Sequence, residues 1–96
     1  MSVVPAVELN GLDLALLPLS NRLLALASDA EAIATNEAEA PKPNMRLVNI
    51  LRRDAAQLRA VRELLHSGGF PPHVAHNWAT VADRYITFVR AARGER

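Results

Sequence analysis

Cysteine is absent from this chain of 96 residues. Disulfide bonds, thiolate catalysis and zinc or iron–sulfur sites held by cysteine are therefore excluded. A chain without disulfides suits a reducing compartment, so we expect a soluble protein in the cytoplasm. Neither a signal peptide nor a membrane span is indicated, because the N-terminal stretch lacks a basic region and its apolar runs are broken by Glu8, Asp13 and Pro18.

Large side chains are scarce as well. The only aromatic residues are Phe70, Trp78, Tyr85 and Phe88, whereas 17 residues are alanine. A chain of this length buries only about 60 to 68% of the surface that its unfolded form exposes. We therefore expect a single domain, residues 1–96, with a thin core that self-association or a partner would supplement.

Charge is distributed unevenly along the chain. Residues 1–41 carry six acidic side chains against one arginine, a net charge of −5, whereas residues 42–96 carry ten cations against four acids, a net charge of +6. All but one of those ten cations are arginine, whose planar guanidinium suits carboxylate or phosphate. The acidic part can neutralise the basic part within one chain or between two chains. The simplest alternative is a solvated basic face.

Apolar residues recur in alternating steps of three and four along three segments, the signature of amphipathic helices. Breakers with proline or glycine separate the segments, with Asn44 placed to cap the second helix and Gly68 to end it. The sequence thus predicts an all-α fold, a three-helix bundle preceded by a short extended N-terminal arm. The expected ranges are a loose arm over residues 1–10 and helices over about 18–38, 45–66 and 73–93. Pro18 either starts or kinks the first helix.

The third helix has the clearest apolar stripe. Its members follow the same rhythm and include three of the four aromatic residues: Val74, Trp78, Val81, Tyr85, Phe88 and Ala92. We expect this stripe to face the core, with Trp78 as the buried anchor of the bundle.

Residues suited to catalysis or cofactor binding form no convincing pattern. His73 and His76 are one helical turn apart, and His66 lies across the loop, but no cysteine or adjacent carboxylate completes a metal site. Ser20 and Ser28 have no histidine near them in sequence, and no glycine-rich phosphate loop is present. We therefore expect no enzymatic activity, no cofactor and no small-molecule substrate.

Four residues are candidates for contact with a protein partner. Leu17 and Leu24 lie about 120° to 140° away from the main apolar face of the first helix, which predicts a second apolar surface. Asp54 and Arg62 fall on or beside the apolar face of the second helix, where a charge needs a partner on another helix or chain. These features favour a small interaction module, an adaptor, accessory or chaperone-like subunit, that forms a homodimer or binds a helical partner.

Nucleic-acid binding is the alternative. Arginine-rich faces of the second and third helices would form the basic surface that phosphate groups bind. The candidate residues for that surface are Arg46, Arg52, Arg53, Arg59, Arg84, Arg90 and Arg93.

Overall fold

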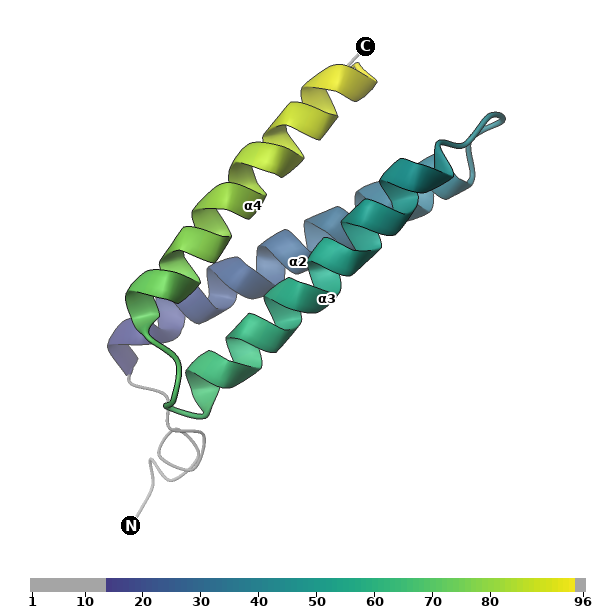
Figure 1. Ribbon diagram of the computed structural model, residues 1–96. Helices are drawn as coiled ribbons and strands as arrows, with labels where there is room; N and C mark the ends of the chain where they lie inside the picture. The colour runs from purple at the N-terminus through teal and green to yellow at the C-terminus, as the bar shows by residue number, and fades with distance from the viewer. Residues whose placement is uncertain (1–13, 95–96) are drawn as a thin grey trace.

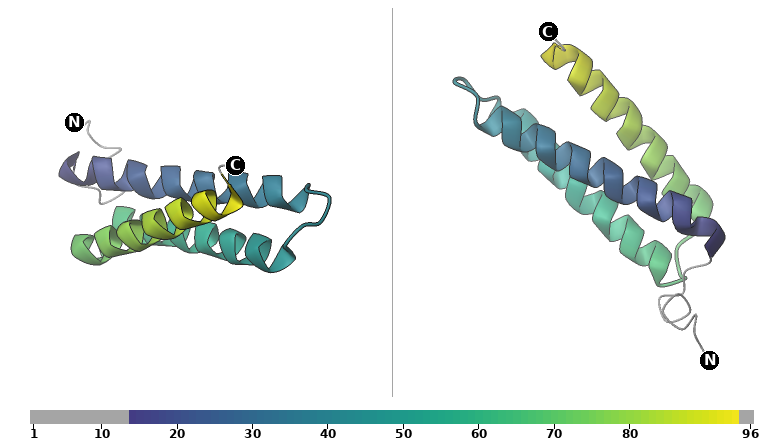
Figure 2. Two further views of the ribbon diagram at one scale, coloured as in Figure 1. Left: turned by 90° about the horizontal axis from the view of Figure 1, so that it is seen from above. Right: turned by 180° about the vertical axis from the view of Figure 1, so that it is seen from behind.

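The computed structural model describes residues 14–94, and all regular structure within that range is helical. A short 3₁₀ turn, η1 (Leu14–Leu16), leads into α2 (Leu17–Ala38), α3 (Met45–His66) and α4 (Pro72–Arg93). The helices α2 and α3 lie side by side, and α4 packs against the pair (Figures 1 and 2). This arrangement confirms the predicted all-α three-helix bundle. The expected N-terminal arm lies outside the described residues.

Helix ends are set by the residues that sequence reasoning identified as breakers and caps. Pro18 sits in the first turn of α2, where no backbone donor is required, so it starts this helix and does not kink it. Asn44 caps α3, because its side-chain oxygen accepts a hydrogen bond of 3.1 Å from the backbone N–H of Leu47. Gly68 adopts a φ of 83° just after α3, a conformation that favours glycine. The helix bounds lie within one residue of the expected ranges.

The core is built mainly between α2 and α3. Leucine and alanine dominate the buried positions of α2, and the buried positions of α3 follow the predicted stripe. The buried apolar residues are Leu23, Leu26, Ala27, Ala30, Ile33 and Ala34 on α2, and Val48, Leu51, Ala55, Leu58, Val61 and Leu65 on α3. Each fully buried leucine contributes about 1.5 to 3 kcal/mol. These two helices therefore supply most of the stabilising burial.

The predicted orientation of α4 is wrong. Its buried residues are Ala75, Ala79, Ile86 and Val89, not the stripe of larger side chains. Trp78, the expected anchor of the core, is 38% exposed, and Val81 and Phe88 are 65% and 67% exposed. We call the set Val74, Trp78, Val81, Tyr85, Phe88 and Ala92 the outer stripe of α4.

Close packing against α2 explains this rotation of α4. Small side chains allow two helix axes to approach closely, and both Ala75 and Ala79 on α4 are fully buried. Ion pairs with α2 also hold the polar face of α4 toward that helix, as described below. The outer stripe is consequently turned away from the α2 side and toward solvent and α3.

Candidate functional site

Four ion pairs within residues 14–94 each join α2 to one of the other two helices. Arg59 of α3 pairs with Glu31, whereas α4 and α2 are joined by three pairs: Arg22–Asp83, Arg90–Asp29 and Arg93–Glu37, at 3.2, 3.5 and 3.0 Å. The partners follow the same order along both helices, so α4 runs parallel to α2. The acidic part of the chain thus neutralises part of the basic remainder within one molecule, which is one of the two arrangements that the charge pattern left open.

The Arg59–Glu31 pair has the best geometry of the four. Arg59 donates two hydrogen bonds to the carboxylate, from Nε at 3.1 Å and from a terminal nitrogen at 2.7 Å. These hydrogen bonds lower the pKa of Glu31, and the carboxylate raises the pKa of Arg59. Both side chains are almost half exposed, so solvent weakens the pair and its main role is to set the register between α2 and α3.

The seven arginines named for nucleic-acid binding fall into two groups. Arg59, Arg90 and Arg93 are engaged with acidic residues of α2. The remaining members are exposed: Arg46, Arg52, Arg53 and Arg84. A phosphate backbone would therefore meet a smaller basic surface than the sequence alone suggested.

A polar cluster of Ser20, Arg62 and His66 joins the start of α2 to the end of α3. The Ser20 hydroxyl lies 2.6 Å from Nε2 of His66, and Nε of Arg62 donates to that hydroxyl at 3.0 Å and to the Ser20 carbonyl at 3.2 Å. Burial, together with the positive charge of Arg62, lowers the pKa of His66 and so favours the neutral imidazole, although the nearby charge of Glu63 opposes this shift. Because Arg62 donates to the hydroxyl oxygen, the hydroxyl can donate a hydrogen bond to Nε2 in the His66 tautomer that carries its proton on Nδ1.

Sequence reasoning missed this contact, because 46 residues separate Ser20 from His66. A serine beside a histidine nitrogen resembles the start of a nucleophile and base pair. The serine, however, is fully buried, so a substrate has no path to its oxygen. The cluster instead satisfies Arg62, one of the four partner candidates, inside its own chain.

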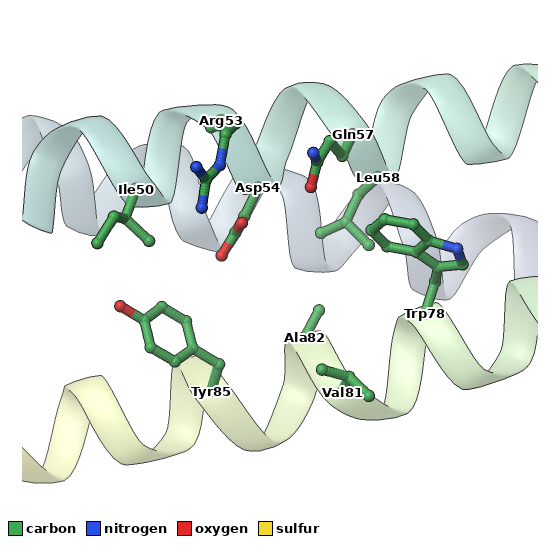
Figure 3. Close-up of a pocket in the computed structure, with 9 residues that line it drawn as sticks. All are labelled: Ile50, Arg53, Asp54, Gln57, Leu58, Trp78, Val81, Ala82 and Tyr85. Atoms are coloured by element: carbon green, nitrogen blue, oxygen red, sulfur yellow. The ribbon is translucent and has the colours of Figure 1, made fainter.

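A groove of about 360 Å³ runs between α3 and α4. Figure 3 shows Asp54 and Leu58 pointing from α3 toward α4, with Trp78 and Tyr85 pointing from α4 toward α3. The other lining residues are Ile50, Arg53, Gln57, Val81 and Ala82. The α3–α4 groove is therefore mainly apolar, and its α3 wall also carries the polar side chains of Asp54, Arg53 and Gln57.

Asp54 is the unusual residue of this groove. Its carboxylate is half-buried, and no ion pair or hydrogen bond of its side chain is described within residues 14–94. Burial raises the pKa of Asp54 above its ordinary value, and the neighbouring positive charge of Arg53 opposes that rise. A carboxylate in such a place is stabilised when a cation arrives from outside the chain.

The outer stripe of α4 continues the groove onto the surface. Its members Val74, Trp78, Val81, Tyr85 and Phe88 repeat every four and three residues, the 3.5-residue period of helices that pack against a partner helix. Val81 and Phe88 are the two most exposed large apolar residues within residues 14–94, and Trp78 is exposed as well. The outer stripe of α4 therefore has the pattern of a helix–helix interface, although its residues Trp78, Val81 and Phe88 are exposed.

The leucines expected to form a second apolar surface lie elsewhere. Leu17 is 41% exposed near the start of α2, and Leu24 is half-buried farther along that helix. Neither residue lines the α3–α4 groove. Of the four partner candidates, only Asp54 belongs to this groove.

Neither a metal site nor a membrane-spanning helix is found in the part of the chain that the structure describes. Between residues 14 and 94, no group of three or more histidine or acidic side chains is arranged to hold a metal ion. Over the same range, no helix is sufficiently long and apolar to cross a membrane. Comparison of the chain with protein-family models, curated proteins and solved structures gives no match.

Proposed function

We propose that this protein is a non-enzymatic interaction module that binds an amphipathic helix in the α3–α4 groove. The observation that carries the proposal is the exposed outer stripe of α4, which borders an apolar groove with one half-buried carboxylate. Monomeric proteins rarely leave a contiguous apolar surface of this kind uncovered. An adaptor, accessory or chaperone-like role in the cytoplasm is part of the same proposal.

The expected occupant follows from the shape and chemistry of the groove. A helix with apolar residues every three and four positions would pack between α3 and α4 and complete a four-helix arrangement. A basic side chain on that helix would meet Asp54, which the groove desolvates. Trp78 and Tyr85 would supply the aromatic contacts that often dominate such interfaces.

Capture from the source cells tests this proposal when it is combined with matched variants. Val81→Glu places a charge on the outer stripe, at a side chain that is 65% exposed and outside the core. Leu14→Glu is the control, because Leu14 has nearly the same exposure, 63%, but lies on η1. We expect Val81→Glu to lose the bound protein and Leu14→Glu to keep it, with and without nuclease. Equal binding by both variants would place the partner elsewhere.

Nucleic-acid binding is retained as the second candidate function. The observation that favours it is the exposure of Arg46, Arg52, Arg53 and Arg84, none of which belongs to an ion pair described within residues 14–94. Material released from the wild-type protein by nuclease alone would support this candidate over the helix-binding module.

A further inference from the structure

We infer that the helix bound in the α3–α4 groove belongs to a second copy of this chain, so that α3 and α4 of each copy form a shared four-helix core around a twofold axis. This inference rests on the proposed function and names its occupant. It also moves the contact from α2, where the sequence placed it, to the opposite part of the bundle. Three features of the surface support it.

First, the surface is self-complementary in form. Each molecule offers a groove between α3 and α4, and each also offers a helix, α4, whose outer stripe has the 3.5-residue period that such a groove accepts. A twofold contact covers both features at once, because the same patch on each copy supplies a groove and a helix.

Second, the surface is complementary in charge. Asp54 lies in the groove and belongs to no ion pair described within residues 14–94. Arg84 is an exposed cation that likewise belongs to none of the ion pairs described in that range. At about 100° per residue, Arg84 lies roughly 60° beyond Val81 around α4, on the side away from Tyr85. Tyr85 borders the molecule's own α3, so Arg84 lies on a side of α4 that faces away from that helix, where the twofold arrangement would bring the α3 of the second copy.

Third, the apolar residues that would be buried are the exposed ones. Val81 and Phe88 are about two-thirds exposed, and Trp78 is 38% exposed, although all three belong to one continuous stripe. The exposed leucines near the start of α2, Leu14 and Leu17, do not line the α3–α4 groove. The α3–α4 surface is consequently the stronger candidate for self-association.

Sedimentation equilibrium of the full chain, combined with charge reversal, tests the inference. The wild-type protein is expected to be a dimer at micromolar concentrations. Asp54→Arg alone and Arg84→Asp alone each place two pairs of like charges across the twofold contact, which should weaken self-association about 100-fold or more. Circular dichroism of each variant checks that the helices are retained.

The decisive experiment mixes the two charge-reversal variants. In a mixed dimer, Arg at position 54 of one copy faces Asp at position 84 of the other, and the second pair is the natural Asp54–Arg84 contact. Both contacts are then attractive, so two variants that are monomers separately should form a heterodimer together. A contact between Asp54 and Arg84 within one chain would give no such recovery.

The contrary outcomes separate this inference from the proposed function. A wild-type monomer at up to hundreds of micromolar, or a dimer that survives Val81→Glu or both charge reversals, overturns the second copy as occupant. Failure of the mixed variants to associate overturns it as well. If the wild-type protein is a monomer but Val81→Glu still loses a captured partner, the groove binds a foreign helix and the proposed function stands.

Discussion

The change Ser20→Ala isolates the buried polar cluster that links the start of α2 to the end of α3. It removes a hydroxyl that is fully buried and that contacts both Nε2 of His66 and Nε of Arg62, at 2.6 and 3.0 Å. Water cannot easily replace this hydroxyl. We therefore expect Ser20→Ala to lower the free energy of unfolding.

The magnitude follows from the two hydrogen bonds. Each contributes about 0.5 to 1.5 kcal/mol, and the partner groups left without the hydroxyl add to the cost because they lie partly inside the bundle. Alanine is the better helix former, by roughly 0.5 kcal/mol, which works in the opposite direction. Ser28→Ala is the matched control, since Ser28 is exposed on the same helix and gains the same propensity.

Thermal unfolding near neutral pH, monitored by circular dichroism, measures the difference between the two variants. We expect Ser20→Ala to be less stable than Ser28→Ala by about 1 to 3 kcal/mol. Because 1 kcal/mol corresponds to about 4 to 8 °C in a domain of this size, the Tm values should differ by at least about 4 °C. Equal Tm values would show that the hydroxyl does not stabilise the junction and would refute the reasoning.

Three further predictions concern pH, the tryptophan and the arginines. Because the folded-state pKa of His66 lies below its ordinary 6.5, the unfolded chain takes up a proton first; stability should be intact above about pH 6.5 and fall as the pH drops below it, and a Tm series should flatten in His66→Gln. In the Val81→Glu background, which keeps the protein monomeric, Trp78→Ala should cost only about 1 to 2 kcal/mol, against about 2 to 5 kcal/mol for Leu58→Ala, since Trp78 is 38% exposed and Leu58 is 1% exposed in the single chain; denaturant titrations compare them, and equal costs would contradict the rotated α4. Duplex binding should be weak and lost at physiological salt; sub-micromolar affinity there, with a salt slope reduced by replacing the exposed Arg46 and Arg52, would favour the nucleic-acid alternative.

The helices and their ends could be predicted because local chemistry determines them. Asn44 caps α3 through its own side chain, Gly68 ends that helix, and Pro18 fits only in a first turn. The inward face of α3 was also predictable, since Leu51, Leu58 and the residues between them leave only one apolar side to bury.

The orientation of α4 could not be read from its own sequence. A single helix shows which of its sides is most apolar, but which side is buried depends on the neighbouring helices, and here Ala75 and Ala79 are buried while Val81 and Phe88 are exposed. The pairing of Asp83 with Arg22 likewise joins residues 61 positions apart. Rotation of α4 by these contacts is what leaves its most apolar stripe exposed.

Only part of the candidate site could be predicted from the sequence. Asp54 was identified because a charge on an apolar helix face requires a partner, and it does lie in the α3–α4 groove. The groove itself was missed, since it depends on how far α4 stands from α3. The contact between Ser20 and His66 depends on the packing of α2 against α3.

Fluorescence of Trp78 in a dilution series tests most directly whether a second copy fills the α3–α4 groove. Trp78 is the only tryptophan of the chain, and it borders that groove with 38% of its surface exposed. Burial by a second copy predicts a blue-shifted emission maximum at high protein concentration that moves to the red on dilution, with the same midpoint as sedimentation. In Val81→Glu the emission should stay at the red-shifted value throughout. An emission maximum that is independent of concentration in the wild-type protein, over a range in which sedimentation shows a dimer dissociating, would contradict the proposed site of contact.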